Sequence, residues 1–150
     1  MAGDEGLLPI YYGENMYSNP GIKAYARVGL ESQLAGASPH QLISMLLDGA
    51  LNAVLRAKIY FENGNIAKRG EMISKAINII DNGLRASLNH EKGQNIAQDL
   101  ERLYDYMSRT LLQANLHNSP SELTSISEIL TNLANTWKEI EPKESQKKNG

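Results

Sequence analysis

The chain has 150 residues, of which 41% are hydrophobic and 21% charged, and its formal net charge is −2. This length suits a single domain, and this balance is typical of a folded globular protein. The small net charge provides no concentrated basic face, which disfavours nucleic acid as a partner. The absence of cysteine excludes disulfides, thiolate nucleophiles and zinc–thiolate sites.

The choice of apolar residues favours helix. The chain contains 19 Leu and 13 Ile but only two Val and one Phe. Sheets are rich in β-branched and aromatic residues, whereas leucine is a good helix former. We therefore expect an all-α protein.

No stretch of the sequence approaches the roughly 18 to 20 apolar residues of a membrane span. Asp4 and Glu5 stand where a secretory signal would carry basic residues. We therefore expect a cytoplasmic protein without membrane insertion.

The sequence divides into three parts. Residues 1–15 are punctuated by Gly and Pro, and we expect a disordered N-terminal extension, either an added segment or the product of an upstream start. We expect residues 16–141 to form the folded domain and residues 142–150 a polar, disordered tail.

The first predicted helices lie between residues 22 and 63. Residues 22–34 have a weak helical spacing that Gly29 disfavours by about 1 kcal/mol, which predicts a short helix dependent on docking. Ser38 and Pro39 form a strong helix start, because serine caps free N–H groups and proline loses nothing at the first position. That helix is expected over residues 40–63, with Gly64 as its terminator.

Three further long helices follow. Residues 66–88 carry an apolar stripe with helical spacing and are predicted to form the second long helix. A turn-like stretch follows at residues 89–94, and the third helix after it is predicted to end near Asn118. Ser119 and Pro120 repeat the cap-then-proline pattern before a fourth helix that Pro142 ends. Four helices of about 20 residues, each about 30 Å long, predict an antiparallel up-down bundle with the short N-terminal helix alongside.

Catalytic motifs are absent from the sequence. No Walker A loop, H-E-x-x-H or G-x-S-x-G is present, and the Glu-x-x-His of di-iron bundles is missing before all three histidines, His40, His90 and His117. At helix ends and in a loop, these histidines are expected to be capping or solvated and not paired with a carboxylate on a helical face.

Acidic residues on the third helix alternate with arginines. Among Asp99, Glu101 and Asp105, Asp99 lies three residues before Arg102 and Asp105 lies four before Arg109, which indicates a solvated, salt-bridged face. We therefore expect no enzyme, no metal and no cofactor.

The first long helix is unusually apolar, with 10 apolar residues among the 14 from Leu42 to Leu55. A single buried stripe needs only three or four per two turns. Two interpretations remain open: either this helix is central and flanked on several sides, or some of its side chains line exposed grooves. Such grooves would receive an amphipathic helix or an extended chain, and residues 22–34 could cover them as a displaceable lid.

Several separated blocks of sequence resemble the FliS family of flagellar secretion chaperones. They are GIKAYARVGLES, ASPHQLISMLLDGAL, KAINIIDNGLRASLNHEKG, LYDYMSRTLLQAN and a last helix that contains Trp137. The blocks agree in order and spacing over residues 16–140.

The resemblance implies a helical bundle that binds the C-terminal segment of flagellin, prevents premature polymerisation and delivers flagellin to the flagellar type III export apparatus. It also implies contacts with the cytosolic domain of the export gate and with the anti-sigma factor. The N-terminal lid and gate contact carry over onto Ile22, Lys23 and Tyr25.

The same resemblance, together with the apolar surplus, selects ten candidates for the flagellin groove. Helical period alone does not distinguish groove from core, so each of them has a purely structural alternative. A self-associating structural or adaptor module is the rival to the chaperone. The candidates are Leu46, Leu47, Ala50, Val54, Ile77, Ile80, Leu84, Tyr104, Leu111 and Leu112.

Overall fold

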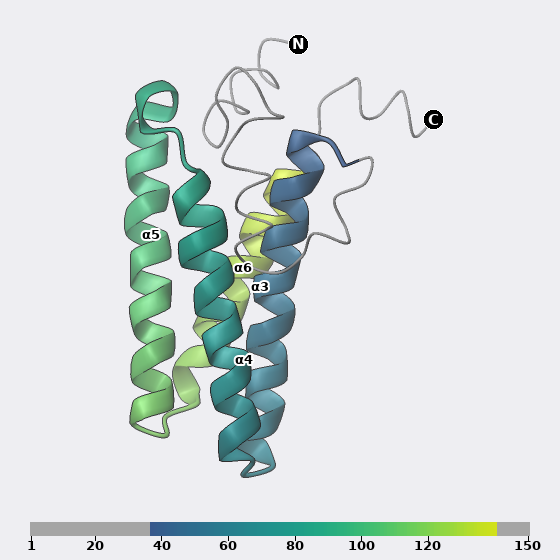
Figure 1. The fold of residues 1–150 in the computed structure, drawn as a ribbon, viewed down its shortest axis with the longest axis vertical. Coiled ribbons are helices and arrows are strands. Elements are labelled where there is room, and N and C mark those ends of the chain that lie inside the picture. Colours follow the sequence, from purple (N-terminus) through teal and green to yellow (C-terminus); the bar gives the residue numbers. More distant parts are fainter. Residues whose placement is uncertain (1–36, 141–150) are drawn as a thin grey trace.

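A computed structural model of the chain describes residues 37–140, which contain helices and no strand. Four long helices lie side by side along the long axis of the molecule (Figure 1). They are α3 (Pro39–Glu62), α4 (Ile66–Asn78), α5 (His90–Leu116) and α6 (Ser121–Glu139).

The all-α prediction is confirmed. The predicted helix at residues 22–34, the extension at residues 1–15 and the tail at residues 142–150 lie outside the described residues. No helix within residues 37–140 is long and apolar enough to cross a membrane.

Helix α3 begins and ends where the sequence predicts. The Ser38 hydroxyl accepts a hydrogen bond from the Gln41 amide at 3.1 Å, and the Ser38 amide donates to Gln41 Oε1 at 2.8 Å. This reciprocal capping box satisfies two backbone donors that the first turn leaves free. Gly64, with a φ of +70°, follows the last turn in a left-handed conformation that suits glycine.

The predicted helix over residues 66–88 remains helical as far as Ser87, but its second half is not α-helical. After α4 the chain forms a π-helical segment, η4 (Ile79–Leu84), and a 3₁₀ turn, η5 (Arg85–Ser87). The Ser87 hydroxyl donates to the Gly83 carbonyl at 2.6 Å, a bond of the kind that competes with regular helical pairing. Gly83 also packs closely on α3, since a Cβ there would lie 3.0 Å from Leu46 Cδ2.

Two other helix starts differ from the prediction. The stretch at residues 89–94 belongs to α5, which Asn89 caps, and Gln94 interrupts it with a φ of 48° and a ψ of −124°. Ser119 does not cap α6, and Pro120 stands at the cap position without a side-chain hydrogen bond. The Ser119 amide donates instead to the Ala114 carbonyl at 2.9 Å, so this serine completes the end of α5.

Helix α3 is the most deeply packed element, since it contacts α4, η4 and α6. Of its ten apolar residues from 42 to 55, seven are buried, Met45 and Leu51 are half-buried, and Leu55 is 42% exposed. The interpretation of this helix as central therefore accounts for most of its apolar surplus.

The first turn of α3 is tied to the last turn of α6. The rings of His40 and Trp137 stack at 4.6 Å between centroids and 8° between planes. The Trp137 indole donates to the His40 carbonyl at 2.8 Å, and His40 Nε2 lies 2.6 Å from the Trp137 carbonyl. Because a carbonyl only accepts, Nε2 must carry the proton. His40 is not solvated, because its side chain is buried between two helices, and its Nε2 caps a carbonyl in the last turn of α6.

Candidate functional site

The structure places most of the ten groove candidates in the core. Only Ile77, which is half-buried, and Leu112, which is 47% exposed, reach the surface. Ile22, Lys23 and Tyr25 lie outside the described residues. The eight buried candidates, whose side chains form the core here and do not line a surface groove, are Leu46, Leu47, Ala50, Val54, Ile80, Leu84, Tyr104 and Leu111.

Ile77 and Leu112 lie on neighbouring helices, α4 and α5. Near one end of this helix pair, Arg69 Nε donates to Asn115 Oδ1 at 3.1 Å. Farther along, the Ser108 hydroxyl donates to Asp81 Oδ1 at 2.7 Å. In the sequence, Ile77 lies between Arg69 and Asp81, and Leu112 lies between Ser108 and Asn115. Both residues therefore lie along the same stretch of contact between α4–η4 and α5.

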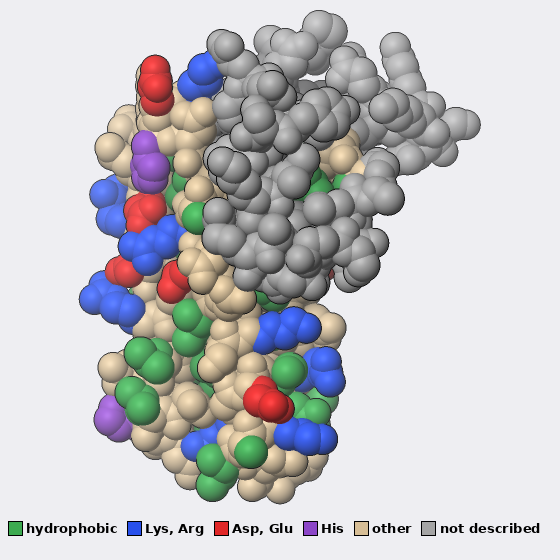
Figure 2. All heavy atoms as spheres, viewed as in Figure 1, with side chains coloured by type: hydrophobic (Ala, Val, Ile, Leu, Met, Phe, Trp, Pro, Cys, Tyr) green, Lys and Arg blue, Asp and Glu red, His purple; other side chains and the backbone are tan. Residues whose placement is uncertain are grey.

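Two more apolar side chains extend this surface beyond the contact between Arg69 and Asn115. Ile66, one turn before Arg69, is 68% exposed, and Leu116, next to Asn115, is 65% exposed. We call Ile66, Ile77, Leu112 and Leu116 the α4–α5 strip. Figure 2 shows hydrophobic side chains exposed on this face of α4 and α5. Sequence reasoning missed Ile66 and Leu116, which lie outside the sequence blocks that resemble the family.

Arg69 connects α4 to α5 near one end of the strip. It is a buried cation, with 7% of its surface exposed. Its Nη1 donates to Asn118 Oδ1 at 2.6 Å and its Nη2 to the Asn115 carbonyl at 3.3 Å. The guanidinium also lies 4.4 Å from the centroid of the Phe61 ring. The last carbonyls of a helix carry partial negative charge, so this arginine caps the C-terminus of α5 from another helix.

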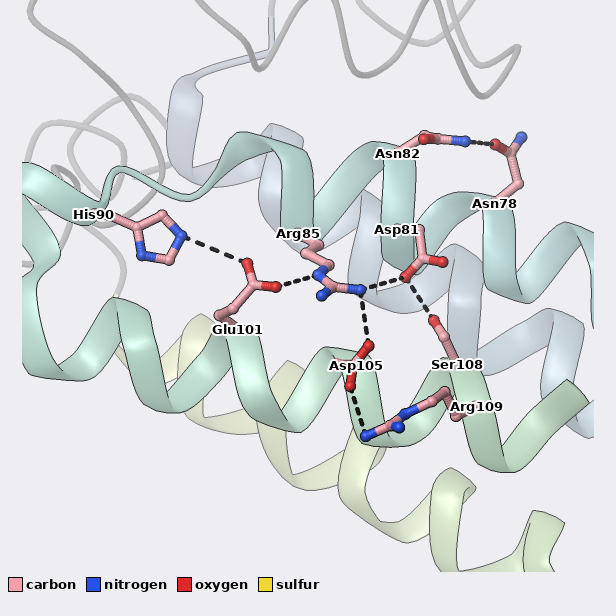
Figure 3. Close-up of polar contacts among 9 residues, drawn as sticks. All are labelled: Asn78, Asp81, Asn82, Arg85, His90, Glu101, Asp105, Ser108 and Arg109. Atoms are coloured by element: carbon pink, nitrogen blue, oxygen red, sulfur yellow. Dashed lines mark hydrogen bonds and ion pairs between the residues drawn. The ribbon is translucent and has the colours of Figure 1, made fainter. Parts of the chain in front are cut away.

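The other end of the α4–α5 pair is held by an ion cluster (Figure 3). Arg85 forms a close ion pair with Glu101, lies 3.1 Å from Asp105 Oδ1 and lies 3.6 Å from Asp81 Oδ1. Arg109 pairs with Asp105 at 2.9 Å, as the sequence predicts for this salt-bridged face. The neighbour that sequence reasoning missed is Arg85, which reaches α5 from another element.

His90 also contacts this cluster. Its Nε2 lies 3.5 Å from Glu101 Oε1, a neighbour that sequence reasoning missed, and its side chain is 48% exposed, in keeping with the expected solvated histidine. The two residues lie eleven positions apart on α5, across the interruption at Gln94. Because the backbone at Gln94 is not helical, regular helical spacing does not predict that His90 and Glu101 lie close together.

The electrostatics of the cluster favour a structural role. Partial burial lowers the pKa of Arg85, but the hydrogen bond and charge of Glu101, with the charges of Asp105 and Asp81, outweigh it and raise the pKa above its ordinary value. Arg85 therefore stays cationic at every pH at which the protein is folded, and it neutralises the carboxylates around it. Within residues 37–140, no group of three or more His, Asp or Glu side chains is arranged to hold a metal ion.

The described part of the chain is thus helical and exposes aliphatic side chains on α4 and α5, and an exposed apolar patch is typical of a surface that binds another chain. Residues 21–144 match the family described as Flagellar protein FliS. The chain belongs to the FliS family of flagellar secretion chaperones.

Curated relatives agree along most of the chain. The flagellar secretion chaperone FliS of Salmonella typhimurium is 55% identical over 130 residues, which cover 87% of this chain and 96% of that protein. The FliS of Escherichia coli is 46% identical over 124 residues, covering 83% and 91%. The FliS of Bacillus subtilis is 31% identical over 116 residues, covering 76% and 84%.

Proposed function

We propose that this protein is a cytosolic export chaperone that binds the C-terminal segment of flagellin, prevents its premature polymerisation and delivers it to the flagellar type III export apparatus. Membership of a family of flagellar secretion chaperones supports this proposal. An antiparallel up-down arrangement of the four helices would leave grooves along the length of the bundle.

The observation that carries the proposal is the α4–α5 strip. Three of its four side chains are about half to two-thirds exposed, and all are aliphatic. A segment that folds as it binds spends part of its interaction energy on ordering, so it needs a long apolar contact surface. The strip provides such a surface, with Arg69 at one end and the Arg85 cluster at the other.

The other partners are part of the same proposal. Ile22, Lys23 and Tyr25 are proposed to cover apolar binding surface in the absence of flagellin and to contact the cytosolic domain of the export gate. Binding of the anti-sigma factor is proposed as a secondary activity. These assignments depend on the sequence resemblance, which places GIKAYA at residues 21–26.

Calorimetry with a synthetic peptide of the flagellin C-terminal segment tests the proposal. We expect Leu112→Asp to weaken binding at least about tenfold, because it places a charge in an apolar contact, while the unfolding midpoint hardly changes. Leu55→Asp on α3 is the matched control, since Leu55 is 42% exposed and lies outside the strip. Equal binding by wild type and Leu112→Asp would contradict the assignment of the strip.

Leu111→Ala separates folding from binding in the same experiment. Leu111 is fully buried beside Leu112, so its truncation is expected to cost about 2–5 kcal/mol of unfolding free energy. At a temperature where this variant remains folded by circular dichroism, its affinity for the peptide should stay close to that of wild type.

A second candidate function, self-association, is favoured by the same exposed strip, because a symmetric dimer would bury it. Sedimentation at several concentrations distinguishes the two functions. If the protein is a monomer at every concentration and binds the peptide, the chaperone function is supported. If it forms a dimer that excludes the peptide and that Leu112→Asp dissociates, self-association is supported.

A further inference from the structure

A second groove lies between α3 and α4, away from the α4–α5 strip. It has a volume of about 330 Å³. Its floor is apolar, formed by Met45 and Ala53 of α3, Met72 of α4 and Ile79. Ala53 and Ile79 are buried, whereas the two methionines are half-buried and accessible from the groove.

The floor is suited to varied apolar side chains. Methionine is unbranched and has a polarisable thioether, so two methionines can adapt to different partners. Gly49 also lines the groove, and a Cβ built there would lie 3.4 Å from Ile79 Cδ1. The missing side chain thus leaves room between the two helices.

The rim of the groove carries positive charge that no acidic side chain of the described residues neutralises. Arg56 of α3 and Lys75 of α4 line it, and within residues 37–140 neither side chain makes an ion pair or a hydrogen bond. Glu71, four residues before Lys75, makes no ion pair with it. Figure 2 shows basic side chains beside hydrophobic ones on this face of α3 and α4.

The one acidic side chain of the lining does not cancel this charge. Asp48 pairs with Lys138 of α6 at 3.1 Å between Oδ1 and Nζ. Arg56 and Lys75, which have no acidic partner within residues 37–140, therefore flank an apolar floor. Unpaired cations at the rim of an apolar groove attract carboxylates and repel basic segments, which selects among amphipathic partners.

We propose that the α3–α4 groove is a second binding site, which takes an acidic amphipathic segment of a partner protein. The apolar side chains of the segment would lie on the methionine floor, and its carboxylates would pair with Arg56 and Lys75. Two cations are too few for a nucleic acid, whose binding relies on many phosphate contacts, and the chain has a net charge of −2.

This site does not depend on flagellin binding. The strip lies on the side of α4 that faces α5, whereas the groove is lined by the side that faces α3. The two surfaces can therefore be inactivated separately, and their failures can be told apart.

The test uses the full chain and a labelled synthetic amphipathic helix with leucines on one face and glutamates on both flanks. Fluorescence anisotropy should give a micromolar dissociation constant that Arg56→Glu and Lys75→Glu each weaken at least about tenfold. A peptide with lysines in place of the glutamates should bind these two variants better than it binds wild type. Lys58→Glu, a charge reversal on α3 outside the groove lining, controls for the general field of the protein.

Three outcomes would overturn the proposal. The first is that the folded wild type does not bind the peptide. The second is that Lys58→Glu loses as much affinity as the two groove variants. The third is that the wild type forms a dimer that Arg56→Glu dissociates, which would assign the groove to a second copy of the chain. Binding of the flagellin peptide should be unchanged in Arg56→Glu, so a failure here leaves the proposed chaperone function intact.

Discussion

Adjacent residues of α5 have different roles because of their phase around the helix. Leu111 is fully buried, whereas Leu112, about 100° further round the axis, is 47% exposed beside α4. Both are leucines in one apolar block of the sequence, LLQAN. Their environments, and not their residue type, assign one to the core and the other to the candidate binding surface.

Gln94 is the residue with the least favourable backbone. Its φ of 48° and ψ of −124° lie in a region that glycine reaches easily and that residues with a Cβ rarely adopt. The side chain is exposed, so replacing it removes no buried contact.

We expect Gln94→Gly to raise the unfolding free energy by about 1 kcal/mol, because it relieves this conformation. Gln98→Gly is the matched control, since Gln98 is exposed on a regular part of α5 and should lose about 1 kcal/mol. Urea denaturation followed by circular dichroism measures both. A loss of stability in Gln94→Gly equal to that in Gln98→Gly would contradict the assignment of strain.

The helices are held in register by polar contacts between neighbouring helices as well as by the core. Arg69 ties α4 to the C-terminus of α5, Arg85 ties the segment after α4 to the middle of α5, and the His40–Trp137 stack ties α3 to α6. Apolar packing is not directional. These directional contacts therefore fix the position of each helix along its neighbour.

Arg69→Met should show the contribution of one such contact. The substitution keeps an apolar stem beside Phe61 but removes three hydrogen bonds to Asn115 and Asn118, so we expect a loss of about 2–4 kcal/mol. Arg69→Lys retains the charge without the planar fork and should lose less. Chemical denaturation measures the loss, and hydrogen exchange at the end of α5 should accelerate. Unchanged exchange there would contradict the capping role.

For the molecule as a whole, partner binding and stability are coupled. A ligand that binds only the folded chain stabilises it by about 2.7 kcal/mol at a concentration 100-fold above its dissociation constant. The proposed ligand contacts the strip that spans α4 and α5, so the stabilisation should extend to the global unfolding of the bundle.

We therefore expect the flagellin peptide to raise the thermal midpoint of the full chain in a concentration-dependent manner. Leu112→Asp should require a proportionally higher peptide concentration for the same shift, since only its affinity has changed. Differential scanning calorimetry measures the midpoint. A midpoint that stays constant at saturating peptide would contradict binding to the folded bundle.

The sequence was sufficient to predict the helical fold class, the start and end of α3, the salt-bridged face of α5 and the family. These features depend on local chemistry: helical period, the Ser38–Pro39 cap, Gly64 and charges three or four residues apart. The family, likewise, is carried by blocks of residues in a fixed order. Each of these signals is contained in a short stretch of chain.

The division between core and surface required the packed structure. Leu46 and Leu112 have equal apolar character in the sequence, and only the position of the neighbouring helices buries the first and exposes the second. The same holds for Arg85 beside Glu101 and for His40 beside Trp137, whose partners lie 16 and 97 residues away in the chain. Contacts over such separations arise when helices pack, and helical periodicity carries no information about which neighbour each face will meet.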